Sequence, residues 1–254
     1  MTTTPNDAAA APVAADRPPR SKHGQQGHVD AAVADAVFLR SASGVEQLPP
    51  IDPAAPEVAF LGKSNVGKSS LLNALLLRKN LVKTSKTPGQ TRLLNQFRVE
   101  LQLRRRRQAL TLVDLPGYGF AKTSKAEHAR LGAMLQAYLG QREGLSLLVH
   151  LFDLRHAPTA QDVTIWDELS ALASNRVVVG TKSDRVSSSK KQMHAKVVAK
   201  ALGIPTDDVV IFSAESREGR SRLWGRILSA VGLHAAELSD VDDAAAAASD
   251  APTG

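Results

Sequence analysis

The stretch GKSNVGKSS, residues 62–70, decides how this chain folds. The apolar run EVAFLG (57–62) before it is rich in β-forming residues, and leucines recur at helical spacing in KSSLLNALLLRK (68–79) after it. The sequence therefore predicts a buried strand, a glycine-rich turn and a helix. In that context the P-loop pattern G-x-x-x-x-G-K-[ST] is complete, through Gly62, Gly67, Lys68 and Ser69.

A P-loop predicts a nucleotide phosphate site. Its glycines let backbone amides turn inward around phosphate oxygens, and the N-terminus of the following helix adds a favourable dipole. We expect the Lys68 ammonium to reach the β- and γ-phosphates and the Ser69 hydroxyl to bind Mg²⁺. The pattern alone does not distinguish ATP from GTP, or a kinase from a hydrolase.

Strand and helix patterns alternate along the rest of the chain. Beyond the first strand, the predicted strands span 94–103, 109–117, 144–155, 176–184 and 208–214. Beyond the first helix, the predicted helices span 126–142, 160–173, 188–203 and 219–232. This order predicts an α/β fold of the P-loop NTPase class, a Ras-like G domain, with a mostly parallel six-stranded sheet and helices on both faces. One strand should run antiparallel, because RRRR (104–107) is too short for a crossover connection.

Composition separates a folded core from two tails. Residues 1–34 are rich in small and polar residues, and residues 235–254 carry five acidic and no basic residues. We expect both tails to be disordered and residues 35–234 to form one domain. Of the net charge of +7, residues 1–50 contribute −1 and residues 235–254 contribute −5, which leaves +13 for residues 51–234. A core this basic favours a polyanionic partner, with RNA as the first candidate.

Several classes of protein are excluded by what the sequence lacks. It has no cysteine, which excludes disulfides, thiolate metal sites and cysteine nucleophiles. No apolar run approaches the roughly 18 residues of a membrane span, and the N-terminal stretch has no signal-peptide core. We expect a cytoplasmic monomer that makes no contact with a membrane.

Three later motifs select the nucleotide. DLPG (114–117) closes a strand, where Asp114 can hold Mg²⁺ through water and the Gly117 amide can meet the γ-phosphate. In TKSD (181–184), the last residue can accept hydrogen bonds from guanine N1 and N2, donors that adenine lacks, and the stem of the lysine can cover the base. FSA (212–214) can offer backbone amides to guanine O6. In this order the motifs predict that the bound nucleotide is GTP.

The segment KTSKTPGQTRLLN (83–95) lies between the P-loop and DLPG and predicts a switch loop. Such a loop presents a threonine that closes over Mg²⁺ and the γ-phosphate only in the triphosphate state. Thr84, Thr87 and Thr91 compete on chemistry alone, and the residues by themselves do not rank them.

The ordered set GKSNVGKSS, TSKTPGQT, DLPGYGFAK, DLRHAP, TKSD and FSA resembles the EngB (YihA/YsxC) family of bacterial GTPases. The resemblance covers roughly residues 35–233. It implies a cytoplasmic GTPase that helps to assemble the large ribosomal subunit and is needed for normal cell division and septation.

By the family pattern, Thr91 joins Ser69 as a Mg²⁺ ligand, and four segments bind GTP or GDP. These segments are the P-loop (Gly62, Lys63, Ser64, Asn65, Val66, Gly67, Lys68, Ser69), the switch (Gly89, Gln90, Thr91, Arg92, Leu93), DLPG (Asp114, Leu115, Pro116, Gly117) and the base loops (Thr181, Lys182, Ser183, Asp184, Phe212, Ser213, Ala214). The chain departs from the pattern at Lys63, Gln90 and Ser183, where the family usually has Arg, Arg or Lys, and Ala. None of these departures removes a ligand, although Gln90 makes the switch less cationic.

The residue after DLPG bears on hydrolysis. Many GTPases place a glutamine there to orient the attacking water, whereas this chain has Tyr118. We expect slow intrinsic hydrolysis, with a water-positioning or cationic group supplied by a partner; Lys83, Lys86 or a potassium ion are further candidates. The alternative is that Tyr118 only packs, and we assign no catalytic residue.

Two features stay open at this point. The run Arg104, Arg105, Arg106 and Arg107, with Lys79, Lys83, Lys86 and Arg92 nearby in sequence, can form a surface for the phosphates of ribosomal RNA in a large-subunit precursor, or a solvated turn. The segment RHAP (155–158) follows a strand end near the nucleotide, and is either a functional loop or a cap of the next helix.

Two other classes of function compete with a regulatory GTPase. A P-loop kinase or metabolic ATPase requires adenine binding, against which TKSD argues. A nucleotide-gated RNA-binding module with negligible hydrolysis is the main alternative, and the basic charge and Tyr118 both favour it.

Overall fold

The computed structural model describes residues 31–82, 93–103, 106–119, 125–142, 144–173 and 175–233. Most of both predicted tails, the switch residues 83–92 and hairpin residues 104–105 therefore lie outside the described part of the chain. Among the described residues, no helix is long and apolar enough to cross a membrane.

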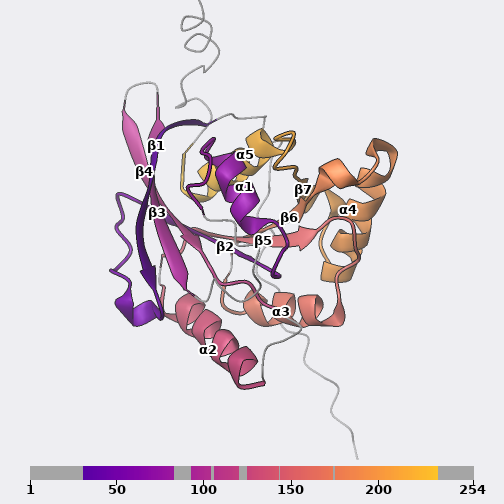
Figure 1. The fold of residues 1–254 in the computed structure, drawn as a ribbon, viewed down its shortest axis with the longest axis horizontal. Helices are drawn as coiled ribbons and strands as arrows, with labels where there is room; N and C mark the ends of the chain where they lie inside the picture. The colour runs from indigo at the N-terminus through magenta and orange to yellow at the C-terminus, as the bar shows by residue number, and fades with distance from the viewer. Residues whose placement is uncertain are drawn as a thin grey trace, which may run out of the picture.

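One sheet organises the described residues (Figure 1), with the strand order β1-β3-β4-β2-β5-β6-β7. The strands are β1 (Ala32–Ala42), β2 (Glu57–Gly62), β3 (Leu94–Gln102), β4 (Arg107–Asp114), β5 (Leu147–Asp153), β6 (Arg176–Thr181) and β7 (Val209–Ile211). β3 alone runs antiparallel to its neighbours, β1 and β4, and the other pairs are parallel. The predicted α/β class, the mostly parallel sheet and its single antiparallel strand are confirmed.

The predicted number of six strands is wrong, because β1 adds a seventh at the edge of the sheet beside β3. Its register with β3 shifts twice, between Val33 and Asp35 and between Phe38 and Arg40. Such irregularities break the two-residue alternation by which a strand is found in sequence. The strand also begins at Ala32, so regular structure starts before the predicted domain boundary at residue 35.

Five helices cover the two faces of this sheet within the described residues. They are α1 (Lys68–Leu75), α2 (Lys125–Gln141), α3 (Ala160–Ser170), α4 (Ser188–Leu202) and α5 (Arg220–Ala230), with 3-10 turns η1 (Val45–Gln47), η2 (Ser183–Arg185) and η3 (Thr206–Asp208). Figure 1 shows α1 and α5 on one face and α2 and α3 on the other. Because both faces are covered, the central strands β2 and β5 are buried almost throughout, which explains their continuous apolar sequences.

The topology fixes where a site can form. Strands β4, β2, β5, β6 and β7 run in the same direction, so their carboxyl ends meet at one edge of the sheet. In α/β folds, ligands bind in the crevice outside those ends. The P-loop, DLPG, TKSD and FSA all follow these strand ends.

A buried ion pair ties the opposite end of β2 to α2. Arg142 Nε and Nη2 donate to the two carboxylate oxygens of Glu57, at 2.9 and 2.5 Å, and Tyr138 Oη donates to Oε1 at 2.7 Å. Glu57 is only 1% exposed. Burial disfavours the charge on Arg142, but the bonds to Glu57 outweigh it and raise the pKa of the guanidinium. The Arg142 guanidinium therefore keeps its charge inside the protein.

We predict that Arg142→Met lowers the free energy of unfolding by about 3–5 kcal/mol, because it leaves the Glu57 charge buried without its partner. Urea unfolding measures this loss. The matched control is Arg98→Met, which removes an exposed pair with Glu100 and should cost less than about 1 kcal/mol. Equal losses in the two variants would contradict a stabilising role for the buried pair.

Candidate functional site

The P-loop bends around the carboxyl end of β2. Asn65 and Gly67 adopt left-handed backbone conformations, with φ of 65° and 103°. Gly67 is the N-cap of α1, where its conformation favours glycine over any residue with a Cβ. The Val66 amide donates to Lys63 O at 3.0 Å and closes the turn. The first amides of α1 thus face the loop, as an anion site at a helix N-terminus requires.

DLPG lies directly against the P-loop. The Ser64 amide donates to Tyr118 O at 2.8 Å, and the Tyr118 amide donates to Gly62 O at 3.3 Å. A Cβ on Gly117 would come within 3.1 Å of Ser64 Oγ and 3.2 Å of Gly62 O. Glycine is therefore needed here for the close approach of the two segments.

Lys68 and Asp114 meet at this junction. Lys68 Nζ contacts Asp114 Oδ1, and the two residues are 9% and 1% exposed. The lysine expected to bind phosphate thus already lies beside the carboxylate expected to approach the metal. Sequence reasoning placed both residues in the site but did not foresee that they pair.

The oxygen donors at the place where DLPG meets the P-loop suit a Mg²⁺ ion. Ser69, at the start of α1, brings a hydroxyl, and the buried Asp114 brings a carboxylate; both are the hard oxygen donors that Mg²⁺ prefers. The Ser64 hydroxyl is also buried here and has no hydrogen-bond partner among the described residues. Thr91, the second predicted ligand, and Gly89, Gln90 and Arg92 lie outside the described residues.

A cavity of about 350 Å³ opens between the P-loop and the ends of β6 and β7. Its lining includes members of three predicted motifs: Gly67 of the P-loop, Thr181, Lys182 and Asp184 of TKSD, and Phe212 and Ala214 of FSA. Segments more than 100 residues apart in sequence thus form a single cavity. Leu93, by contrast, lies before β3 and is exposed.

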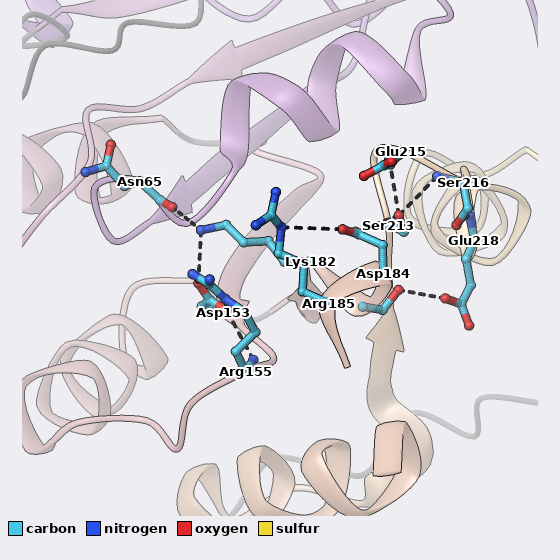
Figure 2. A network of polar contacts seen from close by, with 11 residues as sticks. Asn65, Asp153, Arg155, Lys182, Asp184, Arg185, Ser213, Glu215, Ser216 and Glu218 are labelled. Carbon is cyan, nitrogen blue, oxygen red and sulfur yellow. Dashed lines mark hydrogen bonds and ion pairs between the residues drawn. The ribbon is translucent and has the colours of Figure 1, made fainter. Parts of the chain in front are cut away.

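Asp153 holds Lys182 and Arg155, two side chains that line this cavity (Figure 2). Lys182 Nζ donates to Asp153 Oδ2 at 3.0 Å and to Asn65 O at 2.6 Å. Arg155 Nε and Nη2 donate to Oδ1 and Oδ2 at 2.9 and 2.7 Å. Although burial opposes it, these hydrogen bonds lower the pKa of Asp153 to about 2. Sequence reasoning missed Asp153, even though a carboxylate at the end of a predicted strand was a usable signal.

Ser213 orients the predicted base reader. Its fully buried hydroxyl donates to Asp184 Oδ1 at 2.8 Å and accepts from the amides of Glu215 and Ser216, at 3.2 and 3.1 Å. FSA therefore contributes a side chain to the site in addition to any backbone amide. The geometry leaves the Asp184 carboxylate at the cavity, held in one orientation.

Glu218 is a second residue that sequence reasoning missed. Its Oε2 accepts from Ser183 Oγ and from Lys191 Nζ, both at 2.6 Å. Burial would raise the pKa of Glu218, but these two bonds hold it below its usual value. This contact gives the hydroxyl of Ser183 a structural partner at the position where the family commonly has Ala.

Tyr118 points into the core, as the packing alternative requires. The residue is 2% exposed, and its Oη lies 2.9 Å from His150 Nε2, with which it shares a hydrogen bond. Burial, with the nearby charge of Asp162, raises the pKa of the Tyr118 phenol. The ring therefore does not face the place where water would attack a γ-phosphate.

The RHAP loop contributes to the cavities more than to helix capping. Arg155 lines the cavity of about 350 Å³ that Asp184 also lines. His156, Ala157 and Pro158 line a second cavity of about 240 Å³ beside the P-loop. The cap of α3 is instead Thr159, whose hydroxyl accepts from the Asp162 amide.

Of the basic residues named in the sequence, the structure describes Lys79, Arg106 and Arg107. Leu103 N donates to Arg106 O at 2.8 Å within the β3–β4 hairpin. Arg107 pairs with Gln102 at one end of β3, whereas Asn95, close to the switch, pairs with Asp114 at the other. About 24 Å of strand separates Asn95 from Gln102. Arg107, where β4 begins, thus lies at the edge of the sheet opposite the ends at which the parallel strands meet.

We predict a pH dependence of stability that arises from His150. Its complete burial is the main reason why its pKa falls from 6.5 to about 3. Between these values the unfolded chain binds a proton that the folded chain does not, so the free energy of unfolding should fall by up to about 1.4 kcal/mol per pH unit as the pH drops. Denaturant unfolding between about pH 5 and 6.5 should show that His150→Gln removes this slope, while the exposed control His156→Gln keeps it; at lower pH the lowered pKa values of Asp153 and Glu218 add a slope of the same sign. A slope retained in His150→Gln would assign it to other groups.

Comparison with known proteins identifies the family. A family model described as "50S ribosome-binding GTPase" matches residues 57–182. The "Probable GTP-binding protein EngB" of Geobacter metallireducens is 44% identical over 209 residues, which cover 82% of this chain and 98% of that protein. The protein of the same name from Bacillus subtilis is 42% identical over 196 residues, 77% of this chain and 96% of that protein.

Solved structures agree with the fold. A crystal structure of a probable GTP-binding protein EngB aligns with a TM-score of 0.54 at 22% identity and covers 69% of this chain and 98% of that chain. A variant of Aquifex aeolicus Era, bound to GDP and AlF4⁻, aligns with a TM-score of 0.56 at 23% identity, covering 69% of this chain and 56% of that chain. These likenesses support the G-domain architecture, and the sequence identities above carry the assignment: this chain belongs to the EngB family of GTP-binding proteins and is a GTPase.

Proposed function

We propose that the protein is a magnesium-dependent GTP switch in the assembly of the large ribosomal subunit, with slow intrinsic hydrolysis. The observation that carries the guanine assignment is the Asp184 carboxylate, which Ser213 holds at a cavity shared with the P-loop. A fixed carboxylate matches the N1 and N2 donors of guanine and would be left unpaired against adenine.

At the phosphate end of the site, Lys68 and Asp114 would each exchange the other for a new partner. When a triphosphate enters, the Lys68 ammonium would leave Asp114 for the β- and γ-phosphates, and the freed Asp114 carboxylate would help to hold Mg²⁺. Ser69 and Thr91 would hold Mg²⁺, which neutralises charge on the phosphates. The Gly117 amide would contact the γ-phosphate, and the close approach of Gly117 to Ser64 of the P-loop supports this role. Binding of GTP would thus change the contacts of both DLPG and the switch loop.

Slow hydrolysis follows from the side chain after DLPG. Because Tyr118 packs against His150, it leaves the attacking water without the glutamine that many GTPases use. We propose that docking on the precursor of the large subunit supplies the missing group. The protein would then work in the cytoplasm as a monomer, and a failure of subunit assembly would account for a need for it in cell division and septation.

The main alternative is a nucleotide-gated RNA-binding module with negligible hydrolysis, which the burial of Tyr118 favours. Single-turnover GTP hydrolysis, measured with and without large ribosomal subunits, separates the two. Stimulation by the subunits supports the switch, and no turnover in either condition supports the module.

We predict that Asp184→Asn weakens GDP and GTP binding by at least about 100-fold and shifts the preference to xanthine nucleotides, because an amide can donate where xanthine presents an acceptor. Titration of nucleotide-free protein with fluorescent GDP, GTP, ATP and xanthine nucleotides measures this. Asp167→Asn, at an exposed position on α3, is the control and should bind as the wild type does. Tight binding of ATP by the wild type would overturn the guanine assignment.

We predict that replacing Arg104, Arg105, Arg106 and Arg107 with Ser weakens binding to large-subunit precursors and reduces the salt dependence of that binding, because fewer phosphates are neutralised. Filter binding of ribosomal RNA at several salt concentrations gives the slope. A control with the same loss of charge replaces the exposed Arg40, Arg98, Arg130 and Arg217 with Ser. An unchanged slope in the hairpin variant, or an equal loss in the control, would exclude a specific contact by the hairpin.

A further inference from the structure

A buried carboxylate of α3 lies beside the place where DLPG meets the P-loop. It belongs to Asp162, which is 6% exposed and is the third residue of the helix. Its Oδ2 accepts from the Thr159 amide at 2.9 Å and from the Thr159 hydroxyl at 2.7 Å. Helix capping explains these two bonds. The other neighbours of the Asp162 carboxylate belong to the nucleotide motifs.

The Asp162 carboxylate is close to both members of the bridge between these motifs. Lys63 of the P-loop and Tyr118, the residue after DLPG, form an isolated parallel β-bridge. Lys63 Nζ forms an ion pair with Asp162 Oδ2 at 4.0 Å. Burial is the main reason why the pKa of the Tyr118 phenol is raised, and the nearby charge of Asp162 adds to it. A single carboxylate of α3 therefore acts on both sides of the bridge.

The stem of Lys63 covers the residue that follows the bridge. Gly119 has a left-handed backbone conformation, with φ of 80°. A Cβ on Gly119 would lie 2.9 Å from Lys63 Cε and 3.0 Å from Lys63 Cγ. The methylene groups of the lysine thus rest on the Gly119 backbone while the ammonium reaches the carboxylate. The Lys63 side chain therefore joins the P-loop, the chain after DLPG and α3.

The position of Gly117 depends on this bridge. The Ser64 amide donates to Tyr118 O, and the Tyr118 amide donates to Gly62 O. Gly117 directly precedes Tyr118, so a looser bridge would let the Gly117 amide move. In the proposed function this amide contacts the γ-phosphate, which GDP lacks. A defect in the bridge should therefore weaken the binding of GTP more than the binding of GDP.

We propose that Asp162 is a positioning residue for the γ-phosphate: through Lys63 it holds the bridge, and with it the Gly117 amide, in place before the nucleotide binds. A contact that is already ordered costs less free energy to form on binding. The inference rests on the proposed contact of Gly117 with the γ-phosphate and adds α3 to the groups that support it. Asp162 itself acts through Lys63 and does not bind the nucleotide.

Asp162→Asn tests the charge while it keeps an oxygen that can accept from Thr159. We expect the affinity for a non-hydrolysable GTP analogue to fall about tenfold, as for the loss of one hydrogen bond to a charged group, and the affinity for GDP to change less than about twofold. Calorimetric titration of the nucleotide-free full chain with Mg²⁺ measures both. An unchanged ratio of the two affinities, or an equal loss of both, would overturn the proposal.

The lysine side of the ion pair has its own test. Lys63→Met removes the ammonium and keeps most of the stem, so the ratio of GTP-analogue to GDP affinity should fall as it does in Asp162→Asn. Lys63→Arg keeps a positive charge and should restore most of the ratio that Lys63→Met loses. An equal fall in both lysine variants would show that the charge is not what holds the bridge, and the proposal would be wrong.

Thr159→Ala is the matched control for helix capping. It removes the cap hydroxyl, which should lower the stability of the protein, but it leaves the Lys63 and Asp162 side chains and should leave the ratio of affinities unchanged. Hydrogen exchange of the nucleotide-free protein gives a second readout. The amides of Ser64 and Tyr118 should exchange faster in Asp162→Asn than in Thr159→Ala, because only the first variant loosens the bridge. The same ratio and exchange in both variants would assign the effect to α3 stability and overturn the proposal.

Gly117→Ala separates a failure of this inference from a failure of the proposed phosphate contact. The added Cβ would come within 3.1 Å of Ser64 Oγ, so it displaces DLPG from the P-loop and should also lower the ratio of affinities. If Gly117→Ala lowers the ratio and Asp162→Asn does not, the phosphate contact stands and the role of Asp162 is wrong. If neither variant lowers it, the phosphate contact is wrong as well.

Discussion

The parallel pairing of β4, β2, β5, β6 and β7 is the constraint on which the rest of the structure depends. It brings the ends of these strands to one edge, so that loops far apart in sequence share a cavity. Each loop brings its own chemistry to that edge. The P-loop contributes backbone amides and the Lys68 ammonium, DLPG contributes the Asp114 carboxylate that pairs with it, and TKSD contributes a second carboxylate, Asp184, at the cavity. The site is therefore a consequence of strand direction, and the helices mainly bury the faces of the sheet that makes it.

Carboxylates behind these loops hold them in place. Asp153 joins the Lys182 and Arg155 side chains, and Glu218 joins Ser183 to Lys191. In both cases the hydrogen bonds to the ionised form outweigh the cost of partial burial, which is why both pKa values fall. A fixed base pocket beside an exchangeable Lys68–Asp114 pair suits a protein that keeps its base contacts while its phosphate contacts change.

Tyr118, the residue after DLPG, shows how packing limits the roles that a side chain can take. A tyrosine is compatible in sequence with either a role near the γ-phosphate or a place in the core. Its hydrogen bond to His150 and its burial assign it to the core. The same burial lowers the pKa of His150 to about 3, so the imidazole beside Tyr118 is neutral near pH 7.

The sequence by itself determined the α/β class, the strand order along the chain, the five helices and the motifs, because glycine spacing and apolar periodicity are local properties. It also indicated Asp184 and Lys68, whose roles follow from motif chemistry. Only the tertiary structure decided the pairing of Lys68 with Asp114, the partners of Asp153 and Glu218, the direction of Tyr118 and the existence of β1. Each of these depends on contacts between distant segments or, for β1, on bulges that hide a strand's alternation. The separation of Arg107 from Asn95 has the same origin: these residues, close in sequence, lie at opposite ends of the β3–β4 pair, because an extended strand carries the chain from one edge of the sheet to the other.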